Sequence, residues 1–282
     1  MIKKRQLLDV LDRIGLKSLA LQIYHGTYLG NICAFRLNKE EKIKCPPAAL
    51  MHHVAGTTEK NRFIWSGRLT MVRIVDLLNT AGVDIVGKGD LDVLDFGCGC
   101  GRLTRYLVRL NEKATVFGTD TDAVSIKWCQ ENLHSGNFSV NSSQPPLIFK
   151  EKTFDIVISY SVFTHIQEGD QIKWMSEIAR VLKTGGVMVF SSHPYVDDLA
   201  EVGSTKEEAQ RYRGGHIVSL GADMGYVQGS EWGTFHPTDS IARLANASGL
   251  QLLNTVLSQP APPMDSAGHN LHLLRKVKVE TT

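Results

Sequence analysis

The sequence has few cysteines, little excess charge and no long apolar run, and each shortage excludes a class of protein. Five of its 282 residues are cysteine, too few for a disulfide scaffold, and the odd count leaves at least one thiol unpaired. A formal net charge of +2 lacks the basic excess that binding to a nucleic-acid backbone requires. No apolar run approaches the roughly 20 residues that span a bilayer. We therefore expect a folded cytoplasmic protein with no nucleic-acid partner and no transmembrane segment.

The first 90 residues are expected to form a helical extension. Residues 5–24 repeat apolar side chains every three to five positions, with lysines and arginines between them, which predicts an amphipathic helix. Such a helix packs on its own domain, which we favour, or docks on a membrane surface or a partner. Asp9 and Asp12 interrupt any signal-peptide core. A second amphipathic helix is predicted over residues 63–78.

From residue 91 onward, short apolar segments alternate with amphipathic ones. Strands are predicted over residues 91–97, 115–120, 138–142, 154–160 and 186–192, with helices between most of them. This alternation predicts a parallel sheet covered by helices on both faces. Residues 193–236 follow neither period and are interpreted as an insertion after the fifth strand. The alternation then resumes with a helix over 237–249 and strands over 250–257 and 270–277.

The first of these strands runs into a glycine-rich turn and then a helix. Gly97, Gly99 and Gly101 let the backbone turn sharply and approach a ligand closely. A dinucleotide fingerprint has the spacing G-x-G-x-x-G, whereas here Arg102 stands at the place of its third glycine. The lysine of a Walker loop is also missing. The spacing therefore disfavours NAD and nucleoside triphosphates.

Carboxylates at the ends of two strands point to a ligand without phosphate. Asp95, two residues before Gly97, would repel a pyrophosphate but can hold an ammonium group. Asp120 ends the second strand, about where dinucleotide folds place the acid that binds ribose hydroxyls. Asp122 is the alternative, although its place before a helix is typical of an N-cap. S-adenosylmethionine, which combines a sulfonium, an ammonium, a ribose and an adenine, fits these groups.

Several segments together resemble a known family. VLDFGCGCGR, FGTD, PPLIF with FDIVISYSVFTHI, and RVLKTGG resemble the ordered motifs of class I S-adenosylmethionine-dependent methyltransferases over residues 91–192. The upstream PPAALMHHVAGTTEKNRFIWSGR resembles a bacterial subgroup that acts on small molecules, sugars or natural products. The resemblance implies an α/β, Rossmann-like fold with helices on both faces. Its seven-stranded sheet would have the order 3-2-1-4-5-7-6 and an antiparallel last strand, within residues 91–282.

The resemblance also implies cofactor-binding residues. The methionine half would contact the loop, the ribose Asp120, the adenine Ser142 or its neighbour, and the sulfonium side Tyr160 and Ser161. Thr121 stands where many members carry a hydrophobic residue that packs on adenine. The expected cofactor set is Asp95, Gly97, Cys98, Gly99, Gly101, Asp120, Thr121, Ser142, Tyr160 and Ser161, and no metal site is expected.

The acceptor side is marked by histidines and by the insertion. His165, His193 and His236 are candidates for the general base, and we favour His193 because it directly follows the fifth strand. The aromatic residues of the insertion line an acceptor pocket or form a small core of their own. We expect a small-molecule acceptor with a hydroxyl or amine. The alternatives are a peptide or RNA acceptor, an NAD-dependent oxidoreductase, and a non-catalytic protein that binds S-adenosylmethionine.

Overall fold

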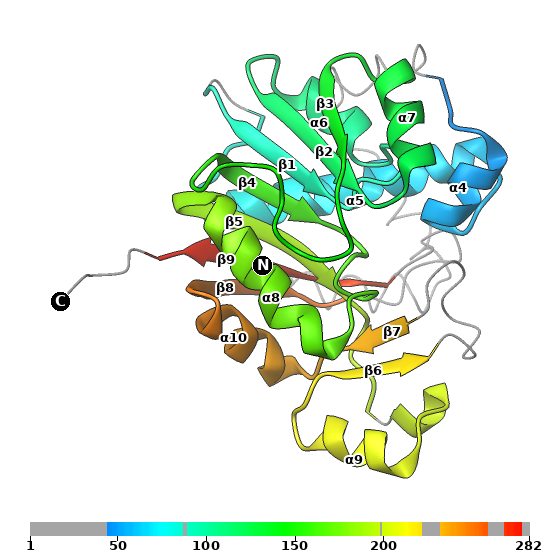
Figure 1. Cartoon of the computed structure of the whole chain (residues 1–282), viewed down its shortest axis with the longest axis vertical. Coiled ribbons are helices and arrows are strands. Elements are labelled where there is room, and N and C mark those ends of the chain that lie inside the picture. Colours follow the sequence, from blue (N-terminus) through cyan, green and yellow to red (C-terminus); the bar gives the residue numbers. More distant parts are fainter. Residues whose placement is uncertain (1–43, 87–88, 198, 222–231, 259–267, 278–282) are drawn as a thin grey trace, which may run out of the picture. The chain divides into compact units, whose positions relative to one another are not determined.

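The computed structural model describes residues 44–86, 89–197, 199–221, 232–258 and 268–277 (Figure 1). The helix predicted over residues 5–24 lies outside these described residues. In chain order the elements are α4 (Ala48–Ala55), α5 (Lys60–Thr80), β1 (Asp92–Phe96), α6 (Thr104–Leu110), β2 (Thr115–Asp120), α7 (Ala123–Asn132), β3 (Gly136–Val140), β4 (Phe154–Ser159), α8 (Glu168–Val181), β5 (Leu182–Ser192), the 3-10 helix η2 (Leu199–Val202), α9 (Lys206–Arg213), β6 (Val218–Gly221), β7 (Trp232–Phe235), α10 (Thr238–Ala247), β8 (Leu250–Val256) and β9 (Asn270–Lys276).

Seven of the described strands form one sheet in the order β3-β2-β1-β4-β5-β9-β8. With β8 and β9 as the sixth and seventh strands of the sheet, this order confirms the predicted one. Strands β1 to β5 run parallel, whereas β9 is antiparallel to both of its neighbours. The central strands are apolar along almost their whole length because helices cover both faces of a parallel sheet.

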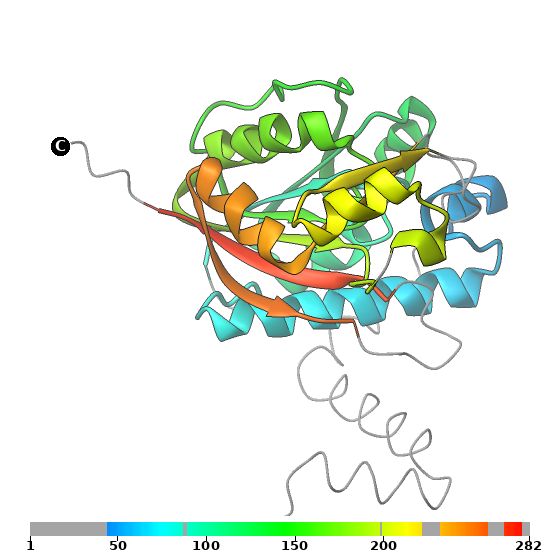
Figure 2. The same cartoon turned by 90° about the horizontal axis from the view of Figure 1, so that it is seen from below.

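Helices α8 and α10 cover one face of the sheet, and the long helix α5 crosses the other (Figure 2). The core under α8 and α10 joins strand side chains such as Phe96 and Phe190 to Trp174, Ile178 and Ile241 of the helices. The apolar side chains of α8 recur every three or four residues, so they lie on one side of the helix and face the sheet. This layered core fixes the strand ends that carry the candidate site.

Helix α5 contains the helix predicted over residues 63–78 and extends it at both ends. It is hydrogen-bonded to the rest of the fold. The Tyr106 hydroxyl donates to the Ile64 carbonyl at 2.7 Å, and Arg73 donates to the His269 carbonyl at 3.0 Å. The division of the chain at residue 90 stays a prediction. Helix α4, which precedes α5, was not predicted.

The insertion after β5 contains η2, α9 and the antiparallel hairpin β6–β7. Its apolar side chains form a small core of their own, made of Leu199, Ala209, Tyr212, Val218, Leu220 and Phe235. Tyr212 therefore packs inside the insertion. The predicted segment was right in position, but its regular elements were missed because each is only four to eight residues long. Thr205 caps α9 in a capping box with Glu208, which is a signal that the sequence does carry.

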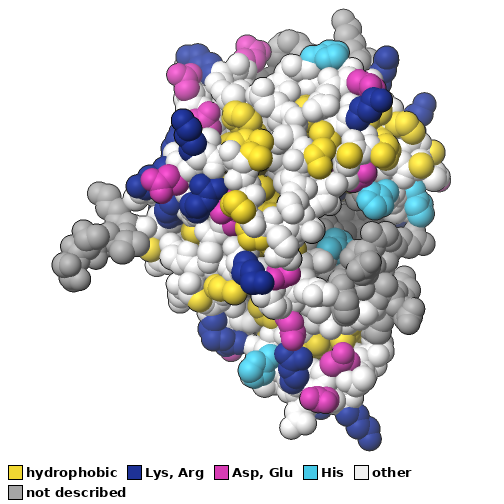
Figure 3. Space-filling view, in the orientation of Figure 1, with side chains coloured by type: hydrophobic (Ala, Val, Ile, Leu, Met, Phe, Trp, Pro, Cys, Tyr) yellow, Lys and Arg dark blue, Asp and Glu magenta, His cyan; other side chains and the backbone are white. Residues whose placement is uncertain are grey.

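Among the described residues, no helix is long and apolar enough to cross a membrane. The cytoplasmic location stays a prediction. On the face shown in Figure 3, lysines and arginines are interspersed with aspartates and glutamates, and no patch of one sign dominates it. A phosphate backbone would have no basic surface to follow on this face.

Candidate functional site

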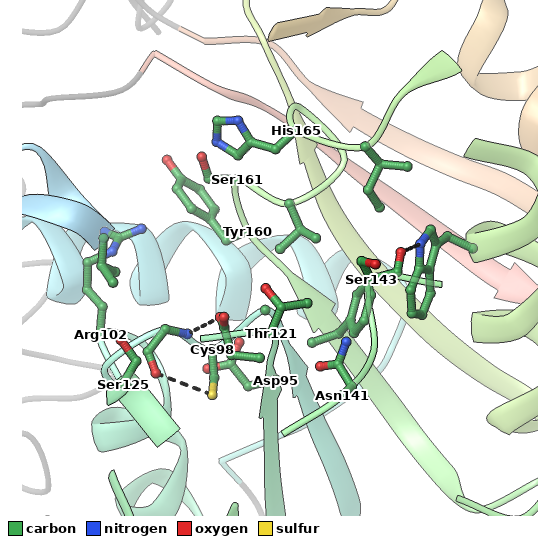
Figure 4. Close-up of a pocket in the computed structure, with 18 of the residues that line it drawn as sticks. Asp95, Cys98, Arg102, Thr121, Ser125, Asn141, Ser143, Tyr160, Ser161 and His165 are labelled. Atoms are coloured by element: carbon green, nitrogen blue, oxygen red, sulfur yellow. Dashed lines mark hydrogen bonds between the residues drawn. The ribbon is translucent and has the colours of Figure 1, made fainter. Parts of the chain in front are cut away.

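A cavity of about 560 Å³ lies at the carboxyl ends of β1, β2 and β4. The carboxyl ends of parallel strands meet at one edge of a sheet, which is where open α/β sheets bind ligands. Figure 4 shows Asp95 of β1, Thr121 just after β2 and Tyr160 just after β4 around this cavity. His53 and Val54 of α4 complete its wall from the N-terminal side.

The glycine loop takes a conformation that side chains would prevent. Gly97 and Gly99 have φ of 75° and 51°, in the left-handed region that favours glycine. A Cβ on Gly97 would lie 2.1 Å from Val162, and one on Gly99 would lie 2.6 Å from Val54. Both valines line the cavity. The loop therefore needs glycine at these two places for its backbone and for the close approach of the cavity walls.

Gly101 and Cys98 lie differently in this loop. Gly101 has φ of 74°, and a Cβ there would meet Leu133 at 2.3 Å, so it serves the packing of the segment after α7. Gly101 does not line the cavity, whereas Cys98 does. The Cys98 thiol is buried and lies 3.6 Å from the Gly99 carbonyl oxygen. Of the two residues, the structure brings only Cys98 to the cavity.

Asp120 joins the end of β2 to the glycine loop. Its Oδ2 accepts from the Gly99 N–H at 2.7 Å, and its Oδ1 accepts from the Asp122 N–H at 2.9 Å. Asp120 lines the cavity, and each carboxylate oxygen keeps a lone pair for a further donor. The site can thus accept hydrogen bonds from two vicinal hydroxyls, as the sequence predicts.

Asp122 is the N-cap of α7, as expected. Its carboxylate accepts from the N–H groups of Val124 at 3.0 Å and Ser125 at 3.2 Å. Partial burial would raise the pKa of Asp122, but the hydrogen bonds from Ser125 and Val124 outweigh it and lower the pKa. Asp122 does not line the cavity, so the geometry favours Asp120 as the ribose ligand.

Asp95 lies at the floor of the cavity. Only 2% of its surface is exposed, and its Oδ2 accepts from the Thr104 hydroxyl at 2.6 Å. Burial raises the pKa of Asp95 to about 6, against the opposing effects of the Thr104 hydrogen bond and the Arg102 charge. A cation that reached this carboxylate would favour its charged form.

Arg102 is a candidate ligand that was not among the cofactor-binding residues expected from the sequence. Its side chain lines the cavity with 8% exposure, its guanidinium carbon lies 4.9 Å from the Tyr160 ring centroid, and its Nη1 donates to the Thr70 hydroxyl at 3.4 Å. Within the described residues, no carboxylate lies within ion-pair distance of it. A buried cation without an ionic partner fits an anionic group of a ligand. Its place directly after the glycine loop was the signal available in the sequence.

The residue expected to contact adenine, Ser142, lies one position away from the residues that line the cavity. Ser142 does not line the cavity, but its neighbours Asn141 and Ser143 do. The Asn141 N–H donates to the Asp120 carbonyl at 3.0 Å, and Trp174 donates its indole N–H to the Ser143 carbonyl at 3.3 Å. Thr121 lines the same part of the cavity and is exposed. The prediction allowed for a neighbour of Ser142.

Tyr160 and Ser161 form the wall after β4, and His269 supports them from behind. The imidazole of His269 stacks on the Tyr160 ring, with centroids 5.2 Å apart. The Ser161 N–H donates to the Ser191 hydroxyl at 2.7 Å, and Ser191 lies 3.1 Å from His269 Nδ1. Burial, with smaller effects from neighbouring cations, holds the pKa of His269 well below its usual value. His269 was missed because the antiparallel pairing of β9 with β5 brings it here.

The three histidines expected to act as base lie in different places. His165 lines the cavity and is half-buried (Figure 4). His193 does not line it. Its ring stacks on Phe235 at 4.8 Å, and burial, followed by the nearby His165, lowers its pKa to about 4. His236 is buried 3.1 Å from the Gln171 side-chain oxygen, and burial lowers its pKa to about 3. Only His165 meets the cavity.

Residues 93–186 match a family described as a methyltransferase domain. This segment is therefore similar to methyltransferase domains. It spans the glycine loop and strands β1 to β4, so the domain holds most of the cavity wall. At the level of the family this confirms the expected cofactor, S-adenosylmethionine. The residues that bind it stay predictions.

The relatives with similar sequences have low sequence identity to this chain. An uncharacterized methyltransferase of Anoxybacillus flavithermus is 27% identical over 61% of this chain and 73% of its own length. The fatty-acid O-methyltransferase of Mycolicibacterium smegmatis is 31% identical over 39% of each chain. Trans-aconitate 2-methyltransferase of Rhodopseudomonas palustris is 29% identical over 42% of this chain and 46% of its own length. The chain thus spans less than half the length of the last two relatives.

Solved structures share the fold at low identity. An S-adenosylmethionine-dependent methyltransferase from Mesorhizobium loti has 17% identity and a TM-score of 0.54 over 70% of this chain and 94% of that one. Magnesium protoporphyrin IX methyltransferase from Synechocystis PCC 6803, solved with bound SAH, has 16% identity and a TM-score of 0.52 over 76% of this chain and 85% of that one. These likenesses confirm the Rossmann-like methyltransferase fold.

Proposed function

We propose that the protein transfers a methyl group from S-adenosylmethionine to a hydroxyl or amine of a small molecule, such as a sugar or natural product. The cavity is the main support for this proposal. Asp120 lines it at the end of β2 and His165 lines it after β4, and its volume of about 560 Å³ suits a small ligand. On the face shown in Figure 3, the interspersed charges give no support to an RNA acceptor.

The cavity offers a partner for each polar part of the cofactor. Asp120 would accept hydrogen bonds from the ribose hydroxyls, and Asp95 would hold the ammonium group directly or through water. Arg102 supplies the cation that the carboxylate of the methionine half requires. Asn141 and Ser143 would meet the adenine edge in place of Ser142. When bound, the cofactor supplies a methyl group on a sulfonium, which reacts by in-line displacement.

Besides binding the cofactor, the protein orients the acceptor and removes its proton. Of the three histidines expected to act as base, His165 is the one that lines the cavity, so we place the general base there and not at His193. His193 is held neutral by burial, and its low pKa makes it a weak base. The relative named for fatty-acid O-methylation supports oxygen as the methylated atom. A carboxylate acceptor would not need the base.

Equilibrium binding and product analysis test the proposal. Isothermal titration should show binding of S-adenosylhomocysteine and none of NADH. S-adenosylmethionine labelled with tritium in the methyl group should then label a small-molecule extract, and the protein and RNA fractions of the same cells should stay unlabelled. Binding of NADH alone would support an oxidoreductase instead. Labelled peptide or RNA would contradict the acceptor class, and binding without any labelled product would support a non-catalytic protein.

A further inference from the structure

The wall segment, defined as residues 161–168, connects β4 to the first turn of α8. Five of its residues line the cavity: Ser161, Val162, His165, Ile166 and Gln167. It has one backbone hydrogen bond of its own, from the His165 N–H to the Val162 carbonyl at 2.8 Å. An irregular segment of this kind is positioned mainly by groups that bind it from outside.

Two such groups come from the seven-stranded sheet and from α8. Ser161 has φ of 62°, which is costly for a residue with a Cβ, and its N–H is held by the Ser191 hydroxyl of β5. Gln171 of α8 donates its amide to the carbonyls of Phe163 at 2.9 Å and Ile166 at 2.6 Å. The Gln171 oxygen can only accept, so His236 must donate to it from Nε2. His236 thereby fixes Gln171.

The third set of contacts comes from the β6–β7 hairpin of the insertion. The Glu168 N–H donates to the Ser219 hydroxyl at 2.8 Å, and Ser219 lies 2.7 Å from the Thr234 hydroxyl. Thr234 donates that hydroxyl to the Ile166 carbonyl at 2.8 Å, and its own N–H donates to the Thr164 carbonyl at 2.8 Å. A backbone carbonyl can only accept and an N–H can only donate, so the Thr234 hydroxyl uses its one hydrogen on the Ile166 carbonyl. The Ser219 hydroxyl must therefore donate to Thr234, and the relay runs in one direction.

Thr234 contacts the wall segment on both sides of His165. Thr234 binds the carbonyls of Thr164 and Ile166, which directly precede and follow His165. Ser219 binds the N–H of Glu168, three residues after His165. Thr234 is fully buried and its hydroxyl is satisfied, so water does not compete for its bonds, whereas Ser219 is half-buried. A shift of the hairpin would move the wall segment with it.

We propose that Thr234 and Ser219 are positioning residues, through which the insertion sets the place of His165 and its neighbours against the methyl group being transferred. This rests on the proposed function. The insertion thus determines acceptor specificity through the wall segment that it holds, while its own aromatic Tyr212 packs in a separate core. A valine at residue 234 would remove the hydroxyl at nearly constant volume and leave the Ile166 carbonyl with one partner fewer.

The probes are S-adenosylhomocysteine and sinefungin, which carries an amine at the place of the transferred methyl. The ratio of their dissociation constants reports on the wall next to that position, because S-adenosylhomocysteine has no group there. We expect Thr234→Val to change this ratio by at least about fivefold, as loss of one buried hydrogen bond does. Thr234→Ser, which restores the hydroxyl, should keep the ratio within about twofold of wild type.

Thr153→Val is the matched control, since its hydroxyl also donates to a backbone carbonyl, that of Lys150, but precedes β4 at the opposite edge of the sheet. Ser219→Ala provides a second, less buried variant if Thr234→Val does not fold, and it should shift the ratio in the same direction. A wild-type ratio in a folded Thr234→Val or Ser219→Ala protein would overturn the inference and leave the proposed function standing. Failure of the wild-type protein to bind S-adenosylhomocysteine would overturn the proposed function itself.

Discussion

The guanidinium carbon of Arg102 lies 4.9 Å from the centroid of the Tyr160 ring, and both side chains line the cavity. Arg102 follows the glycine loop and Tyr160 follows β4, so this contact joins two parts of the site that are 58 residues apart in the chain. The ring stabilises the cation without neutralising it. The charge of Arg102 therefore stays available to an anionic group of the ligand.

Arg102→Met should weaken binding of S-adenosylhomocysteine by about tenfold or more, because a charge-assisted hydrogen bond is lost. Binding of 5′-methylthioadenosine, which lacks the amino-acid half, should be unchanged. Titration calorimetry with both ligands checks this. Arg105→Met is the control, since Arg105 is also buried but does not line the cavity. Equal losses for both ligands would contradict the assignment of Arg102 to the carboxylate.

Asp120→Ala should weaken binding of both ligands by about 1.5–3 kcal/mol, because both carry the ribose. The loss includes the Gly99 N–H bond, which holds the loop. Asp122→Ala separates the two acids. It should cost about 1 kcal/mol of unfolding free energy through the lost N-cap of α7, and leave ligand affinity nearly intact. If Asp122→Ala weakened ligand binding and Asp120→Ala did not, Asp122 would be the ribose ligand.

Binding of S-adenosylhomocysteine should tighten as the pH rises through about 6. The buried Asp95 has a pKa of about 6 in the free protein, and only its charged form attracts the ligand ammonium. For unfolding the sign is opposite. Between about pH 4 and 6 the folded protein keeps the Asp95 proton that the unfolded chain releases, so the contribution of Asp95 to stability falls with rising pH. Calorimetry at several pH values should show a flattened binding profile in Asp95→Asn.

His165→Gln should lower the rate of methyl transfer to a hydroxyl acceptor by about 10²–10⁴-fold if this histidine removes the proton. His193→Phe should keep most of the rate, because His193 stacks on Phe235 away from the cavity lining. The test is the pH–rate profile of both variants with an identified acceptor. A larger loss in His193→Phe, with a changed acidic limb, would return the role of base to His193.

The sheet could be predicted from the sequence because buried parallel strands are recognisable apolar runs. The positions of Gly97, Gly99, Asp95 and Asp120 beside the cavity could be predicted because they depend only on where two strands end and on the turn after the first. The prediction of Ser142 was off by one residue, because the chain directly after β3 is polar over several positions and any of them could meet the cavity. These parts of the site are local in sequence.

The acceptor side could not be predicted to the same depth, since it is built from distant segments. The stacking of His269 on Tyr160 requires β9 to pair antiparallel with β5. The relay from Glu168 through Ser219 to Thr234 requires the hairpin to dock on the wall segment. His193 follows β5 as expected, yet it turns toward Phe235 of the insertion. No local pattern encodes these contacts.

A crystal structure of the protein soaked with S-adenosylhomocysteine would show where the cofactor binds. We expect electron density in the cavity, with the ribose hydroxyls within hydrogen-bond distance of Asp120 and the carboxylate of the methionine half at Arg102. The sulfur should face the wall segment at Ser161 and His165. Density at another place on the molecule, or a ribose that contacts neither oxygen of Asp120, would rule out this cavity or Asp120 as the site of cofactor binding.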